Sequence, residues 1–296
     1  MNTEQDFVKW ACNYSGIDGG DLTKSEYWLV GIEFATGGSA ENDFIKKCES
    51  GFISVNEPAD TFTMRYWAGN SFNSWVQKFC YALIKSTAHE DIGKWHTEII
   101  NNTTPGEDGI YYYPTSFFGG NNTEQLKFYK FNLFPIPFPK DEDDIWESYY
   151  KGKDINLYDI TGFATKECYR EFCFKKRLPE LLAKLYDRND SKHLKIVVAG
   201  RKNQYGFKFC KSLEAALSKS PYRISSTSGN IQEKQYGTYT TKKDNKKRKR
   251  WYSYKTFTIN DGNGDRRISV INTPFLNRAG DHEAIANLAK KINELQ

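Results

Sequence analysis

Four short apolar stretches constrain the fold of this chain more than any other feature. They are YWLVGIEF (27–34), FYKFNLFPI (128–136), LKIVVAG (194–200) and RISVINTPF (267–275). Each is rich in aromatic or β-branched residues and ends in turn-forming residues, which is typical of buried strands. Segments with helical periodicity separate and follow them, at 70–86, 165–187, 205–219 and 282–295. This alternation predicts an α/β fold, with helices on both faces of a mostly parallel sheet.

We expect a single domain over residues 1–296, built as a three-layer sandwich around a central four-stranded sheet. Two regions interrupt this pattern and are interpreted as insertions. The first, near 87–125, is polar and glycine-rich, and long irregular stretches of this kind are usually functional or mobile. The second, near 225–260, alternates Tyr, Thr and Phe around a basic tip. That pattern predicts a basic β-hairpin.

Composition narrows the class of protein further. The content of 39% hydrophobic and 16% aromatic residues is too high for a disordered chain. No stretch approaches the ~18 apolar residues of a membrane span, and the start MNTEQDFVKW lacks a signal-peptide pattern. We therefore expect a cytoplasmic monomer with no membrane partner. A net charge of +5 is weak overall, so the distribution of basic residues decides whether a polyanion binds.

The cysteines and histidines give no pattern that predicts a metal site. Six cysteines occur without a CxxC pair, which favours reduced thiols. An iron–sulfur site built from Cys12, Cys48, Cys168 and Cys173 is the alternative, although their spacing is wide. The histidines show no metal-ligand spacing. We expect neither a metal nor a cofactor.

Polar residues gather where the predicted strands end. Gly31 and Glu33 end the first strand, and Asn132 lies in the second. Gly200 and Arg201 follow the third, and Asn272 and Thr273 end the fourth. Because ligands bind at the carboxyl ends of strands in open α/β sheets, these residues predict one crevice. The loop GIEFATGGS lacks the G-x-G-x-x-G spacing of a dinucleotide site.

The same blocks resemble motifs of the uracil-DNA glycosylase superfamily, in the same order, over about residues 28–295. GIEF is similar to its first motif, with Glu33 at the water-activating position and Phe34 in place of a proline. FNLFPIPF resembles the second strand, in which an Asn reads the base edge, here Asn132. IVVAGRKNQYGFKF resembles the third strand with its Gly-Arg turn. VINTPFLNR stands where a His-Pro-Ser type motif is expected, without the histidine.

The resemblance implies a monofunctional DNA glycosylase that hydrolyses the N-glycosidic bond of a flipped base and leaves an abasic site. The missing histidine and the substitutions Glu33 and Phe34 favour a modified pyrimidine as the base. By analogy, such an enzyme would remove hypermodified bases from phage DNA in bacterial defence. The implied catalytic residues are Glu33, Asn272 and Thr273, and the implied base-binding residues are Gly31, Phe34, Asn132, Phe72 and Trp67. DNA contacts fall to Arg201, Lys246, Lys247, Arg248, Lys249, Arg250, Asn277 and Arg278.

Other interpretations of these residues stay open. The chain could be a catalytically inactive protein that binds nucleic acid or a nucleotide on the same fold, or a hydrolase of free nucleosides or nucleotides. Glu33 could be a helix cap or a structural partner of Arg201. The basic tip could be a solvated loop, in which case its rings, Trp251, Tyr252 and Tyr254, would not stack on bases. Asp281 is expected to cap the last helix.

Overall fold

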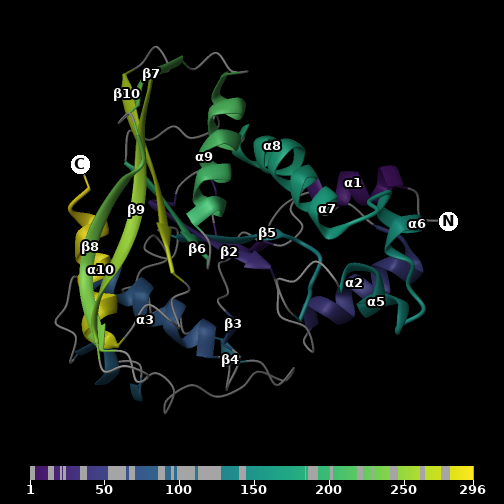
Figure 1. The fold of residues 1–296 in the computed structure, drawn as a ribbon, viewed down its shortest axis with the longest axis horizontal. Coiled ribbons are helices and arrows are strands. Elements are labelled where there is room, and N and C mark those ends of the chain that lie inside the picture. The colour runs from purple at the N-terminus through teal and green to yellow at the C-terminus, as the bar shows by residue number, and fades with distance from the viewer. Residues whose placement is uncertain are drawn as a thin grey trace.

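The computed structural model describes most of the chain. It covers residues 4–12, 17–20, 22, 25–33, 39–52, 65–66, 71–85, 91–94, 97–98, 111–112, 128–139, 145–183, 185, 193–200, 203–218, 223–227, 230–240, 246–260, 264–274 and 281–295. The fold is mixed α/β (Figure 1).

One sheet of eight strands organises the molecule. Its order is β1 (Ile17–Gly20), β5 (Phe128–Phe134), β2 (Tyr27–Glu33), β6 (Leu194–Ala199), β10 (Asp265–Thr273), β9 (Lys247–Asn260) and β7 (Arg223–Thr227), and β8 (Gln232–Thr240) also pairs with β9. The four central strands, β5, β2, β6 and β10, are parallel. They are the four strands predicted from the sequence, so the mixed α/β fold with a parallel centre is confirmed.

The predicted total of four strands is wrong. β1 joins the edge of β5, and β9, β7 and β8 extend the other side, all in antiparallel pairs. A separate pair, β3 (Arg65–Tyr66) and β4 (Tyr111–Tyr112), stands outside this sheet. The short segment IDGG of β1 has no alternation of apolar and polar residues, so no strand is predicted there.

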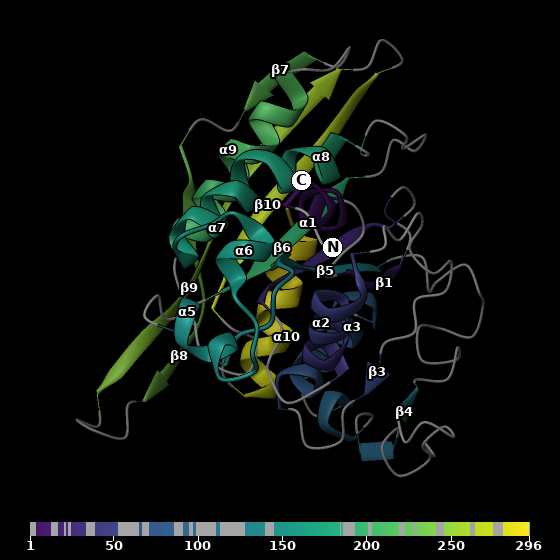
Figure 2. The ribbon, with the colours of Figure 1, turned by 90° about the vertical axis from the view of Figure 1, so that its right-hand side faces the viewer.

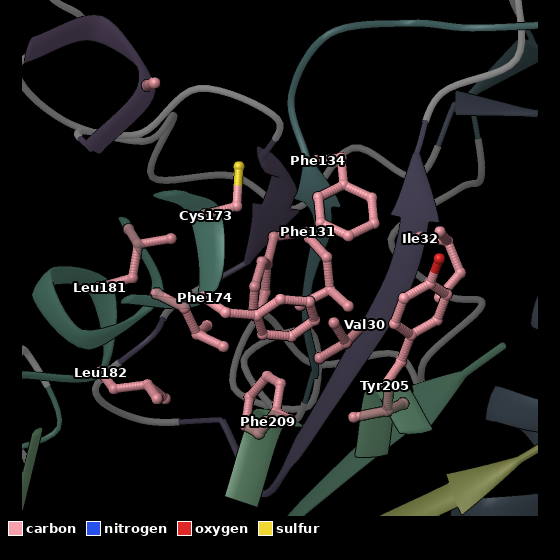
Figure 3. Packing of buried hydrophobic residues seen from close by; sticks show 14 of the residues in the cluster. Val30, Ile32, Phe131, Phe134, Cys173, Phe174, Leu181, Leu182, Tyr205 and Phe209 are labelled. Atoms are coloured by element: carbon pink, nitrogen blue, oxygen red, sulfur yellow. The ribbon is translucent and has the colours of Figure 1, made fainter. Parts of the chain in front are cut away.

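Helices pack on both faces of the sheet because successive side chains of each strand point to opposite sides. Tyr27 and Leu29 pack with α3 (Ser71–Lys85) and α10 (His282–Asn293), on what we call the α10 face. Trp28 and Val30 pack toward α8 (Leu178–Ala183) and α9 (Asn203–Ser218), on the α9 face. Figure 3 shows the core of the α9 face, where rings of β5 meet Phe174, Tyr205 and Phe209.

The layers differ in detail from the predicted sandwich. A group of helices gathers on the β5 side of the molecule, opposite the strands β8 to β10 (Figure 1). The group comprises α1 (Glu4–Cys12), α2 (Ser39–Ser50), α5 (Trp146–Lys151), α6 (Leu157–Thr161) and α7 (Lys166–Phe172). Aromatic side chains hold it together, for example Phe44 against Tyr150 and Trp146 against Tyr169. Part of the aromatic excess therefore builds this lateral core.

The predicted basic hairpin is confirmed, but it is not a separate insertion. β8 pairs with the first half of β9, from Thr240 opposite Lys247 to Gln232 opposite Tyr254. The second half of β9 pairs with β10 and β7, so a single strand belongs to the hairpin and to the main sheet. Figure 2 shows β8 and β9 as an arm that extends away from the other elements.

Three further observations complete the fold. Most of the predicted insertion at 87–125 lies outside the described residues; within it, a helical turn covers 91–94 and β4 covers 111–112. Asp281 caps α10 as predicted, since its Oδ1 accepts a hydrogen bond of 2.9 Å from the backbone N–H of Ala284. None of the helices in the described ranges is long and apolar enough to cross a membrane.

Candidate functional site

The carboxyl ends of the four parallel strands form a row of small and polar residues across the sheet. Gly31 of β2 lies opposite Asn132 of β5, and Thr273 of β10 lies opposite Ala199 of β6. Val30 pairs with Val198, so Gly31 and Ala199 are neighbours as well. Asn132, Gly31, Ala199 and Thr273 thus follow one another on the α10 face, and we call them the sheet row. Three strand spacings separate Asn132 from Thr273 by about 14 Å.

The position of the sheet row matches a general property of open α/β sheets. The chain runs from β2 to β5 on one side, and then continues with β6 and β10 on the other. The direction of strand order therefore reverses between β2 and β6. Ligands of such sheets bind at the carboxyl ends beside this reversal. Gly31 and Ala199, the two smallest members of the row, lie on the two strands that flank it.

Gly31 is required by the side chain of Asn132. A β-carbon at position 31 would lie 2.1 Å from Oδ1 and 3.2 Å from Cγ of Asn132. The amide of Asn132 therefore lies across Gly31, and its side chain is only 5% exposed. An amide offers two donors and one acceptor oxygen, which suits it to reading a polar edge. The close approach of the Asn132 side chain thus explains why position 31 is a glycine, which the sequence alone did not reveal.

Asn272 and Thr273 point to opposite faces of β10. Ile271 packs with α10, so Thr273 shares its face and belongs to the sheet row. Asn272 instead meets the first turn of α9, where a β-carbon at Gly206 would lie 2.6 Å from Cβ of Asn272. Both residues were predicted to serve the same pocket. The structure brings Thr273, and not Asn272, onto the face that carries Asn132.

The Gly-Arg turn after β6 also has a packing reason. The backbone N–H of Gly200 donates a hydrogen bond of 3.0 Å to the carbonyl of Thr273, which ties the ends of β6 and β10 together. A β-carbon at position 200 would lie 2.6 Å from Cδ1 of Ile32. Glycine at this position therefore lets β2 and the end of β6 approach closely.

Several predicted site residues cannot be placed beside this row. The backbone of Glu33 ends β2, opposite Phe134 of β5, so the acid stands at the same edge of the sheet. Its side chain and that of Phe72, which lies in α3, are outside the described part of the chain. Phe34, Trp67, Arg201, Asn277 and Arg278 lie outside the described residues altogether.

Buried cations support the end of β5, and sequence reasoning missed them. Arg177, fully buried in the π-helix Cys173–Arg177, donates from Nη1 to the carbonyl of Leu133, at 3.0 Å. This carbonyl directly follows Asn132 in the chain. Lys166 lies 4.2 Å from the ring centroid of Phe138, and the guanidinium of Arg170 lies 5.9 Å from that of Phe134. π-Helices are often found at functional sites, so this segment draws attention to the end of β5. The sequence pattern does not distinguish a π-helix from an α-helix, so only the structure reveals it.

The basic part of β9 presents its charges to solvent. Lys246, Lys247, Arg248 and Lys249 are exposed, and Arg250 is half-buried. Trp251 is 46% exposed, with Nζ of Lys249 5.8 Å from its ring centroid. Tyr252 and Tyr254, the other two rings considered for stacking on bases, are buried and pack into the core of the α10 face. Burial raises the pKa of Tyr252 to about 12.

Other titratable groups lie away from the sheet row or are poorly reactive. His193 precedes β6 at its amino end, and its Nε2 is 2.9 Å from Oγ of Ser269, which is 2.7 Å from Oγ1 of Thr256. Burial, with help from the charges of Lys195 and Arg267, lowers the pKa of His193 to about 4. Burial also raises the pKa of the Cys12 and Cys48 thiols to about 12, which disfavours their nucleophilic thiolates at neutral pH.

The described residues hold no group of three or more His, Cys, Asp or Glu side chains that could bind a metal ion, and the four cysteines of the iron–sulfur alternative do not gather there. The chain has no significant match to a protein-family model, a curated protein or a solved structure.

Proposed function

We propose that this chain is a DNA glycosylase that removes a modified pyrimidine from DNA and leaves an abasic site. The observation that carries the proposal is the sheet row, in which an amide lies across a glycine at the carboxyl end of a parallel sheet. Asn132 and Thr273 add hydrogen-bonding groups to a floor formed by Gly31 and Ala199. In the proposed complex a planar base lies against this floor and the amide reads its edge.

Glycosidic hydrolysis assigns roles to the residues around this floor. A water oxygen attacks C1′ of the sugar as the C1′–N bond breaks, and the bonding electrons leave with the base. The departing base takes up a proton, and the attacking water loses one. In the proposed mechanism Glu33, at the end of β2, orients the water and stabilises the positive charge on the sugar. Thr273 contacts the departing base. Asn272 has no part in this contact, because it lies on the α9 face of β10.

The exposed basic segment of β9 supports DNA as the partner. Residues 246–250 are all basic, and they lie on an arm that extends from the molecule (Figure 2). Lysine and arginine on such a surface bind phosphates without regard to sequence. Arg201, Asn277 and Arg278, which lie outside the described residues, are the further proposed DNA contacts. We further propose a single domain that acts as a cytoplasmic monomer without cofactor, and a role in defence against phages with hypermodified DNA.

The proposal is tested by base release. Purified protein is incubated with DNAs that carry uracil, hydroxymethylated pyrimidines or glucosylated hydroxymethylcytosine, and abasic sites are detected by alkaline cleavage. Glu33→Gln is the test variant, and Glu26→Gln, at the amino end of β2, is the matched control. We expect cleavage of a modified substrate that Glu33→Gln loses and Glu26→Gln keeps.

Two outcomes separate the alternative classes. Salt-sensitive DNA binding without abasic sites on any substrate would make the chain a nucleic-acid-binding protein on the same fold. Release of bases from free nucleosides, with none from DNA, would make it a nucleoside hydrolase. Either result would overturn the proposed glycosylase.

A further inference from the structure

A pocket of about 490 Å³ lies at the outer edge of the hairpin, apart from the sheet row. It is lined by residues 233–235 of β8, by Trp251 and Tyr252 of β9, and by Lys291 and Glu294 at the end of α10. Figure 1 shows β8 beside α10 along this side of the molecule. Its volume falls within the range of small-ligand sites. The mechanism proposed above does not use it.

Trp251 is the distinctive member of this lining. Among the described residues, the exposed large hydrophobic side chains are Trp251, Phe207 and Tyr158. Lys249 precedes Trp251 by two residues, on the same side of β9, with Nζ 5.8 Å from the indole centroid. Tyr252, next in the strand, is buried and fixes the backbone from the other side. A rigid strand therefore holds an indole ring at the surface, beside a cation.

The remaining lining combines hydrogen-bond donors and acceptors. Lys291 and Glu294 form an ion pair of 2.8 Å at the end of α10. Nζ of Lys234 lies 5.0 Å from the ring centroid of Tyr254, and Glu233 and Gln235 stand on either side of Lys234 in β8. Such a mixed set suits a ligand edge that both donates and accepts hydrogen bonds.

The ligand class follows from the pocket and the neighbouring charges together. An exposed indole stacks on a flat ring, the pocket rim can read a polar edge, and Lys247, Arg248 and Lys249 attract phosphates. A nucleotide combines these three properties. Bases of a duplex stack on one another and do not offer their faces, so the nucleotide must be unpaired.

We infer that Trp251 and this pocket form a subsite for an unpaired nucleotide of single-stranded DNA that runs along the hairpin. The inference rests on the proposed function only for the identity of DNA as the partner. It adds a preference for single-stranded DNA, or for an unpaired segment beside the excised base. The subsite binds DNA whether or not base excision occurs.

The test compares single-stranded and duplex oligonucleotides by fluorescence anisotropy, without a modified base. Trp251→Ala removes the ring, and Trp251→Phe keeps a smaller one. Phe207→Ala is the matched control, because Phe207 is 47% exposed on α9, with Nζ of Lys211 4.6 Å from its ring centroid. We expect Trp251→Ala to weaken single-strand binding by about 5- to 150-fold, the range for one stacked base. Trp251→Phe should lose about threefold or less, with duplex binding and Phe207→Ala unchanged.

Three results would overturn the subsite. They are an unchanged affinity of Trp251→Ala for single strands, an equal loss on duplex DNA, and a wild-type protein that binds no single strand. Base release, measured on the same proteins with modified DNA, keeps the two proposals apart. Trp251-dependent binding without base release would overturn the glycosylase and support the subsite. Base release that persists without any effect of Trp251 would do the reverse.

Discussion

Substitution of Gly31 by alanine tests the packing on which the proposed base site depends. The new methyl group would lie 2.1 Å from Oδ1 of Asn132, far inside van der Waals contact. Because Asn132 is 5% exposed, its amide can yield only by rotating into packed surroundings or by shifting β5 away from β2. Overpacking of this kind costs roughly 1–3 kcal/mol of unfolding free energy. We expect Gly31→Ala to fall within that range.

A double-mutant cycle isolates the contact. Asn132→Ala removes the amide, so the methyl group at position 31 then has no side-chain oxygen to displace. In that background, Gly31→Ala should cost less by about 1 kcal/mol or more, measured by urea unfolding followed by circular dichroism. Gly152→Ala is the control, since Gly152 ends α5 with right-handed helical backbone, and a β-carbon there meets nothing nearer than 3.6 Å.

Additive effects would refute the argument. If the two single changes sum to the double within about 0.5 kcal/mol, the amide of Asn132 does not lie across Gly31 in solution. The sheet row would then lose the feature that carries the proposed function. A coupling of the expected sign would establish the amide position without any assay of activity.

Three further predictions concern charges elsewhere in the chain. Arg177→Met should lower the unfolding free energy, measured in urea, by about 1.5–3 kcal/mol, because the Leu133 carbonyl loses a charge-assisted hydrogen bond. An unchanged unfolding free energy would show that Arg177 does not stabilise the end of β5. The pKa of His193 is lowered in the folded protein. The neutral side chain therefore makes its full contribution to the unfolding free energy above pH 6.5, and this contribution is lost as the pH falls toward 4. The wild type should lose about 1–2 kcal/mol more than His193→Gln over that range, after allowance for its partial exposure, and parallel pH curves would contradict this. Replacing Lys247 and Lys249 by Gln should reduce the salt slope of single-strand binding by about 1.4, whereas an unchanged slope would remove them as phosphate contacts.

The sequence predicted the parallel centre because four apolar runs with β-branched and aromatic residues mark buried strands locally. It missed β1, whose IDGG segment has no such pattern, and it could not reveal that β9 also pairs with β10 and β7. That pairing depends on contacts between segments far apart in the chain. Local pattern alone therefore assigned the whole of β9 to a hairpin insertion, and did not assign its second half to the main sheet.

The candidate site was partly predictable, because the local pattern also marks where the strands end. Strand ends placed Gly31, Asn132 and Thr273 at one edge of the sheet, as the structure has them. The sequence did not settle which of Asn272 and Thr273 shares a face with Asn132, because that depends on which helix each face meets. Arg177 was also missed, since a basic residue in a helix is usually solvated, and its contact with Leu133 is purely tertiary.

The most direct test of the account compares Asn132→Ala and Asn272→Ala in single-turnover base release from the preferred modified DNA. These asparagines lie near the same edge of the sheet, but on opposite faces. The account predicts a loss of base release of tenfold or more for Asn132→Ala, the effect of one lost hydrogen-bonding group, and little change for Asn272→Ala in folded protein. Full base release by Asn132→Ala, with activity lost in Asn272→Ala, would contradict the proposed site on the α10 face.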